Sequence, residues 1–251
     1  MRAGVCSFWL PKAGNQPHEY EDAFWPTQST GRTSRTVRCA VADGATEASF
    51  SGLWAGMLVR AFARGKLRSN RIRDALVPLQ TAWKNEVSRK PLPWYAEEKL
   101  RSGAFSSLLG LILTEARGGN AVTWSVMAVG DSCLFVVRDD ALLASFPIQA
   151  SDRFDNSPNL ISSVPSRNES LDTFLCVETG LARSGDTFYL LTDALACWFL
   201  GRYEEGTAPW TTLNGVGDGT WHESVADWMM GEQRENRIRN DDVTMLRIRL
   251  E

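Results

Sequence analysis

The feature that most limits how this chain can fold is a set of β-prone apolar runs, each bordering an aspartate. Three runs lead directly into the acid, as in TVRCAVAD (36–43) and DTFYLLTD (186–193). Burying a lone carboxylate is costly, because the charge loses its water and must be neutralised, paired or bound to a cation. The strand ends of one sheet system can converge at one rim, where such acids would meet. The aspartates of this pattern are Asp22, Asp43, Asp131, Asp193 and Asp241.

Carboxylates gathered at one rim favour a cation site. They repel one another unless cations lie between them, since like charges at close range raise each other's pKa. Oxygen ligands alone are what magnesium and manganese prefer. For any single aspartate the alternative is a structural role at a turn or helix N-cap, which is natural for Asp43 and Asp193 because both precede helical segments. The spacing alone leaves both interpretations open.

The remaining pattern predicts a mixture of strands and helices. Apolar residues at intervals of three and four predict amphipathic helices over 47–65 and 70–87, and shorter helices are expected at 194–203 and 222–236. Strand-like runs cover 3–10, 36–43, 104–116, 121–131, 133–143, 171–179, 186–193 and the end of 239–251. We therefore expect an α+β fold with helices packed on sheet faces.

Loops and domain organisation follow from the polar stretches. The motif GGN at 118–120 indicates a hairpin. Residues 151–170 are rich in Ser, Asn and Pro and predict a long surface excursion. No repeat, low-complexity tract or linker divides the chain, so residues 1–251 are expected to form a single domain.

Charge and hydropathy exclude several classes of function. The net charge is −3 and basic residues are mixed with acidic ones, so no footprint for nucleic acid or an anionic membrane stands out. No apolar run approaches the roughly 20 residues that span a bilayer, so we expect a soluble, cytoplasmic protein. The five cysteines lack any CxxC spacing and are predicted to be reduced core residues: Cys6, Cys39, Cys133, Cys176 and Cys197.

An ordered series of short motifs resembles the metal-dependent protein phosphatases of type 2C, and most closely a compact bacterial branch without a regulatory extension. DG and GDS are weak signals alone, but six motifs in the right order are strong. The resemblance implies a four-layer α-β-β-α sandwich, in which two antiparallel sheets are flanked by helices. The motifs are EDAF (21–24), ADGA (42–45), GAFSSLLGLIL (103–113), VGDS (129–132), LLTDALA (190–196) and NDDVTML (240–246).

The resemblance also implies a set of metal positions. Asp43 would bridge two magnesium or manganese ions, and Gly44 would offer its carbonyl oxygen. Asp193 and Asp241 would complete the shell of one ion. Two acids, Glu21 and Asp22, would hold waters of the other ion, and Asp131 would serve a weaker third ion.

The implied activity is a phosphoserine/phosphothreonine protein phosphatase. Its catalytic acids, Asp43, Asp193 and Asp241, would act through water activated by the two ions, whose charge lowers the pKa of that water and neutralises the phosphoryl oxygens. The implied substrate is a phosphorylated protein, the product of a serine/threonine kinase in bacterial signalling, and the chain is expected to be a monomer. The stretch 151–170 falls where the family carries a variable flap near the cleft.

Several positions depart from the family pattern. Pro17 stands where the family has a substrate-binding arginine. Lys12, His18 and Arg32 are the candidate replacements, although each is expected to be solvated on a loop. The other departures are Ala45, Ala194 and Cys133, which stand for a histidine, a glycine and an arginine.

These departures keep two further functions open. A non-catalytic phosphoprotein-binding or scaffold module that retained the fold is the main alternative, and the missing arginine at position 17 motivates it. A metallohydrolase acting on a small phosphorylated metabolite is a weaker one.

Overall fold

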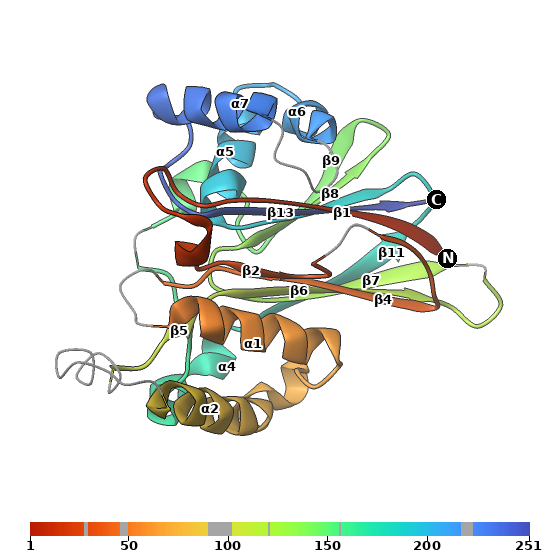
Figure 1. Ribbon diagram of the computed structural model, residues 1–251. Helices are drawn as coiled ribbons and strands as arrows, with labels where there is room; N and C mark the ends of the chain where they lie inside the picture. Colours follow the sequence, from red (N-terminus) through yellow and green to blue (C-terminus); the bar gives the residue numbers. More distant parts are fainter. Residues whose placement is uncertain (28–29, 46–49, 90–101, 120, 156, 217–222) are drawn as a thin grey trace.

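Two antiparallel sheets pack face to face with helices on both outer faces, as the computed structural model shows (Figure 1). The predicted α+β, four-layer α-β-β-α sandwich is therefore confirmed. The structure describes residues 1–27, 30–45, 50–89, 102–119, 121–155, 157–216 and 223–251, without the side chains of 30–33 and 223–224.

The first sheet has six strands in the order β3-β1-β13-β12-β8-β9. The first and last strands of the chain lie side by side in it, with Val5 opposite Ile248. In chain order its strands are β1 (Arg2–Leu10), β3 (Thr30–Thr33), β8 (Cys133–Arg138), β9 (Ala141–Phe146), β12 (Thr187–Leu191) and β13 (Val243–Leu250).

The second sheet has five strands in the order β11-β7-β6-β4-β2. The hairpin predicted from GGN is confirmed, because β6 and β7 pair antiparallel from Leu108↔Val129 to Glu115↔Val122, although Asn120 itself lies outside the described residues. The strands are β2 (Ala23–Trp25), β4 (Thr36–Ala42), β6 (Leu108–Glu115), β7 (Val122–Val129) and β11 (Cys176–Ala182). A small separate sheet pairs β5 (Phe105–Ser106) with β10 (Ile161–Ser162).

Helices cover both outer faces (Figure 1). The first sheet carries α5 (Asp193–Glu204), α6 (Pro209–Gly215) and α7 (Glu223–Arg234), and the second carries α1 (Ser51–Ala63), α2 (Ile72–Ser88) and α4 (Leu171–Phe174). Short 3₁₀ turns lie at η1 (Pro17–Glu19), η2 (Ser69–Arg71), η3 (Ser151–Arg153) and η4 (Pro165–Asn168).

Close packing fixes α1 against the second sheet. Phe62 of α1 lies over Gly110 of β6, where a Cβ atom would come within 2.4 Å of the Phe62 ring. Only glycine leaves room for the ring at this point of the strand. The apolar face of the helix predicted for 47–65 therefore packs on the sheet, with Trp54, Leu58 and Phe62 buried, while residues 47–49 of that prediction lie outside the described part of the chain.

Three expectations about elements are wrong. Residues 133–143 form a hairpin of β8 and β9 rather than one strand, because Asp139 and Asp140 both have positive φ and make the turn. The strand expected at 171–179 begins only at Cys176, after the helix α4. The stretch 151–170 is not only a surface excursion, because Ile161 and Ser162 are fully buried.

The cysteine prediction is confirmed in part. Cys6, Cys39 and Cys133 are buried free thiols, whereas Cys176 is exposed and Cys197 is half-buried. Cys176 lies on the edge strand β11, whose side chains are mostly in contact with solvent. Among the described helices, none is long and apolar enough to cross a membrane.

Candidate metal centre at one end of the sandwich

The predicted acids lie at one end of the sandwich, opposite the end that carries both termini (Figure 1). Three of them follow strands that run toward this end: Asp43 follows β4, Asp131 lies just after β7, and Asp193 follows β12. Glu21 and Asp22 precede β2, and Asp241 precedes β13, which run the other way. Antiparallel pairing thus brings acids from far apart in the sequence to one rim.

Asp43 is held by its main chain. Its N–H donates to Ser107 Oγ at 2.9 Å, and its carbonyl accepts from the Ser107 N–H at 2.8 Å. The Ser107 hydroxyl also bonds with Ser132 at 2.7 Å. Two serines of the quoted motifs GAFSSLLGLIL and VGDS therefore position the acid, a role that the sequence did not reveal.

Gly44 lies at a close approach of three segments. A Cβ atom on it would come within 2.5 Å of the Glu21 carbonyl oxygen and 2.9 Å of the Ser51 main chain. Its neighbour Ala45 donates its N–H to the Phe105 carbonyl. The absence of a side chain is thus what lets the Glu21 segment and the start of α1 meet here.

Glu21 and Asp22 have different partners. Ser51 donates to Glu21 Oε1 at 2.5 Å. Asp22 is 5 % exposed, and its Oδ2 accepts from Thr244 Oγ1 at 2.6 Å, while Tyr20 bonds to the same Thr244 hydroxyl. The other oxygen, Asp22 Oδ1, is buried and has no hydrogen-bond partner among the residues that the structure describes.

Asp131 and Asp193 form the other side of the rim. Asp131 is 6 % exposed, and its Oδ1 is likewise buried without a hydrogen-bond partner. The helix N-cap role considered for Asp193 is not the one the structure shows, because Thr192 is the N-cap of α5 and Asp193 is the first residue of the helix, where its Oδ1 accepts from the adjacent Ala194 N–H at 2.6 Å. Asp193 Oδ2 lies 3.6 Å from the Arg239 guanidinium. Ala194 has no positive φ, so alanine is unstrained there.

Asp241 and Asp242 divide their roles. Asp241 is half-buried, and its Oδ1 accepts from the Asp242 N–H at 2.9 Å. Asp242 instead accepts from two N–H groups of the N-terminal segment, those of Lys12 at 2.9 Å and Glu21 at 2.6 Å. The second acid of the NDD motif, which the sequence left without a role, thus ties the two ends of the chain together.

The acids share one electrostatic neighbourhood. Burial raises the pKa of Asp43 well above its usual range, and the charges of Asp22, Asp193, Asp131 and Asp241 raise it further. The pKa of Asp22 is also raised well above its usual range, first by burial. Burial and then the charge of Asp193 raise the pKa of Asp131 to about 7, and burial and then Asp241 raise that of Asp193 to about 6.

These acids fit divalent cations. Within the described residues, no three His, Cys, Asp or Glu side chains are already arranged as a metal cage. The rim nevertheless has two buried carboxylate oxygens without a partner, on Asp22 and Asp131, and its acids raise one another's pKa. Buried charges are normally paired or coordinate metals, and an all-oxygen donor set suits magnesium or manganese.

The position of the missing arginine is exposed. Pro17 begins η1 on the surface, and His18 beside it is also exposed. Lys12 is half-buried, and the Arg32 side chain lies outside the described part of the chain. Arg239, which precedes β13, is the guanidinium found against one of the rim acids, and the sequence offered no signal for it beyond its place before the NDD motif.

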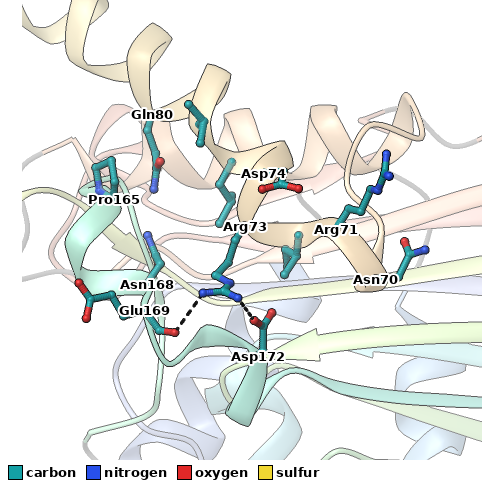
Figure 2. Close-up of a pocket in the computed structure, with 12 residues that line it drawn as sticks. Asn70, Arg71, Arg73, Asp74, Gln80, Pro165, Asn168, Glu169 and Asp172 are labelled. Carbon is teal, nitrogen blue, oxygen red and sulfur yellow. Dashed lines mark hydrogen bonds and ion pairs between the residues drawn. The ribbon is translucent and has the colours of Figure 1, made fainter.

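A separate cavity lies in the outer helical layer. It measures about 450 Å³ and opens between α2 and the segment 165–172, where Arg73 pairs with Asp172 at 2.7 Å (Figure 2). Its polar lining mixes both charges, and none of the predicted acids lines it. The acidic rim is therefore a different part of the molecule.

The solved structures similar to this chain include serine/threonine phosphatases. No protein-family model and no curated protein matches the chain. The Mycobacterium tuberculosis serine/threonine phosphatase PstP/Ppp is 17% identical with a TM-score of 0.60, and each chain is covered over 100%. The PstP catalytic domain in complex with two manganese ions is 14% identical, with a TM-score of 0.55 and coverage of 99% and 100%.

A third structure, RsbX in complex with magnesium, is 16% identical with a TM-score of 0.53 and coverage of 100% of this chain and 96% of that chain. At these identities the likeness is one of fold. The chain thus shares its fold with these solved structures, which is the fold that its motifs predicted.

Proposed function

We propose that the chain is a metal-dependent phosphoserine/phosphothreonine protein phosphatase, a hydrolase of phosphate monoesters. The observation that carries the proposal is the pair of buried, unpartnered carboxylate oxygens on Asp22 and Asp131, set among acids that raise one another's pKa. The fold, shared with metal-dependent phosphatases over their whole length, supports the same conclusion.

The proposed ligands are the acids of the rim. Asp43, the Gly44 carbonyl, Asp193 and Asp241 would hold two ions of magnesium or manganese, with Glu21 and Asp22 acting through water, and Asp131 would serve a third. When bound, such ions lower the pKa of water and neutralise charge on the phosphoryl oxygens.

The chain's own residues would hold these acids in place. Ser107 fixes the main chain of Asp43, Thr244 orients Asp22, and Asp242 holds the Glu21 main chain. The thiols of Cys133 and Cys197 are poor nucleophiles, because burial raises the pKa of both and keeps them protonated. Water is therefore the proposed nucleophile.

The proposal includes a biological setting. We expect a monomer in the bacterial cytoplasm that acts on a phosphoprotein made by a serine/threonine kinase, as part of a signalling pathway. This setting is supported by the resemblance of the motifs and by the phosphatase structures that share the fold.

Manganese-dependent hydrolysis tests the proposal. The chain should hydrolyse p-nitrophenyl phosphate and a phosphothreonine peptide when manganese is added, and an excess of chelator should stop the reaction. Asp193→Ala should abolish it, whereas Asp152→Ala, which removes an exposed acid in η3, should not. Wild-type turnover no greater than that of Asp193→Ala would refute the proposal.

A phosphoprotein-binding module without activity is the second candidate. The exposed Pro17 at the arginine position favours it. It predicts that the manganese-loaded chain binds a phosphothreonine peptide in fluorescence anisotropy and returns that peptide intact. Release of phosphate during the same incubation would exclude it.

A further inference from the structure

Arg239 lies at the mouth of the acidic rim. It belongs to the segment between α7 and β13, and its carbonyl accepts from the Asp241 N–H at 3.0 Å. Its guanidinium is 3.6 Å from Asp193 Oδ2, and the side chain is 43% exposed, whereas that of Asp193 is 11% exposed. The guanidinium thus connects a buried acid of the rim to the solvent from which a substrate would enter.

The Arg239–Asp193 contact is a loose ion pair. At 3.6 Å it is longer than a hydrogen bond, and it is made by a single nitrogen rather than by the two-nitrogen fork that locks an arginine on a carboxylate. For comparison, Arg138 binds Asp186 through two nitrogens, both at 2.6 Å. Arg239 also forms a side-chain hydrogen bond with the half-buried Cys197 thiol, so the guanidinium stands at the rim with more than one contact and with part of its surface open to solvent.

The charge on the rim decides which partner it prefers. In the structure the guanidinium faces the negative charge of Asp193. Once the carboxylates are neutralised by cations, that attraction is lost. A phosphate dianion entering the rim then becomes the better partner, and its oxygens match the planar donor fork of arginine.

We propose that Arg239 binds the phosphate group of the substrate, so that this chain takes its phosphate-binding guanidinium from the segment before β13 instead of from position 17. The inference rests on the proposed function and assigns a substrate-binding residue to that site. It also implies a ligand class: phosphate monoesters whose dianionic group reaches the rim.

Calorimetric titration of inorganic phosphate into the manganese-loaded protein tests the assignment. Arg239→Ala should weaken phosphate binding by about ten- to a hundredfold, as expected for loss of hydrogen bonds to a charged group. Arg239→Lys should lose less, because it keeps the charge without the fork. Arg183→Ala removes the same charge from an exposed arginine paired with Asp139 at the far end, and should bind phosphate like the wild type.

Two further readouts separate this role from a structural one. Arg239→Ala should raise KM for p-nitrophenyl phosphate more than it lowers kcat, as expected for binding shared by the ground and transition states. Titrated with manganese alone, it should bind the ion at least as tightly as the wild type, because one competing positive charge is gone.

Three results would overturn the assignment. The first is an Arg239→Ala variant that binds phosphate like the wild type, and the second is one that no longer binds manganese. The third is a wild type that hydrolyses esters but does not bind phosphate. That result would refute the phosphate-binding role of Arg239 and leave the proposed phosphatase function intact. Phosphate binding that depends on Arg239, without any hydrolysis, would instead retain the binding role and refute the phosphatase.

Discussion

Gly44 shows how tightly single residues are constrained at the acidic rim. The atoms nearest to its missing Cβ belong to the main chain of Glu21 and Ser51, which cannot rotate away as a side chain would. Any substituent must therefore displace the segment carrying Glu21 and Asp22, or the start of α1, from the rim.

We expect Gly44→Ala to lower the free energy of unfolding by about 1–3 kcal/mol, the usual cost of overpacking, and to weaken manganese binding. Urea denaturation and calorimetry measure the two effects. Gly231→Ala is the matched control, because no atom lies within 4 Å of its Cβ position in α7. Equal behaviour of the two variants would show that the close approach at Gly44 is unimportant.

The raised pKa of Asp131 makes the stability of the metal-free protein depend on pH. Its pKa is raised in the folded chain to about 7, so between pH 4 and pH 7 the folded state binds more protons than the unfolded state. The stability that this group contributes is complete at acidic pH and is lost as the pH rises through 7. Asp131→Asn should lack this loss.

The stability gain of Asp131→Asn over the wild type should therefore grow from pH 4 to pH 7, reaching at most about 4 kcal/mol, and level off above. Chemical denaturation in the presence of chelator at several pH values measures it. A gain that stays constant with pH would contradict the raised pKa.

At the residue scale the sequence predicted the acids better than their surroundings. Asp43, Asp131 and Asp193 could be found because each comes at or just after the end of an apolar strand. Thr244, inside β13, and Arg239, before it, could not, because a single polar residue in or beside a strand gives no sign of which distant acid it will meet after folding. Their roles depend on pairing between segments about 50 and 220 residues apart, as for Arg239–Asp193 and Thr244–Asp22.

At the element scale, the segment before β13 holds the N-terminal segment in place through a pair of side chains that we call the clasp, Asn240 and Asp242. Asn240 Oδ1 accepts from the Ala13 N–H at 2.7 Å, and Asp242 accepts from the N–H groups of Lys12 and Glu21. The clasp sets where Glu21 and Asp22 stand relative to the rest of the rim.

Asp242→Ala should release this segment. Amide hydrogen exchange over residues 12–21 should become faster, and manganese should bind more weakly, because two N–H groups lose a charged acceptor worth about 1–3 kcal/mol each. Asp242→Asn should be intermediate, since its amide oxygen can accept but its NH₂ group cannot. Asp227→Ala, at an exposed position of α7, is the control and should leave hydrogen exchange in residues 12–21 unchanged. Unchanged exchange in Asp242→Ala would show that the clasp does not hold this segment.

Elements with a long, regular pattern were predictable, and interrupted ones were not. The helices α1 and α2 follow from apolar residues at intervals of three and four. The turn at Asp139–Asp140 was missed, because a polar pair inside an apolar run is also compatible with a continuous strand, and only the positive φ angles show the reversal. The small β5–β10 sheet joins two-residue strands, too short to leave a period.

At the scale of the whole molecule, an ion pair between the buried Asp186 and the partly exposed Arg138 joins the layers at the end opposite the rim. Asp186 is completely buried and accepts from Arg138 through two nitrogens and from the Arg183 N–H at 2.9 Å. Arg138 in turn donates to the Leu181 carbonyl of β11, so the cluster links the two sheets. The order of the six motifs along the chain predicted the sandwich. It did not predict this cluster, because Asp186, Arg138 and Arg183 lie outside those motifs.

Asp186→Ala should lower the free energy of unfolding by about 1–3 kcal/mol, because the Arg183 N–H and the partly exposed Arg138 guanidinium lose their charged acceptor. Because the cluster lies at the far end from the acids, manganese affinity should be unchanged at temperatures where the variant is folded. Thermal denaturation and calorimetry check both statements. A variant of wild-type stability would show that the cluster does not hold the sheets together.

The central claim is that the carboxylates at one end of the sandwich form a divalent-cation site. Calorimetric titration of manganese into the chelator-treated protein tests it most directly, with Asp43→Asn as the comparison because Asp43 feels the charge of four other acids. If the carboxylates form this site, the wild type should give a saturable binding isotherm for manganese, and Asp43→Asn should give none. No binding heat from the wild type, or the same isotherm from both proteins, would contradict it.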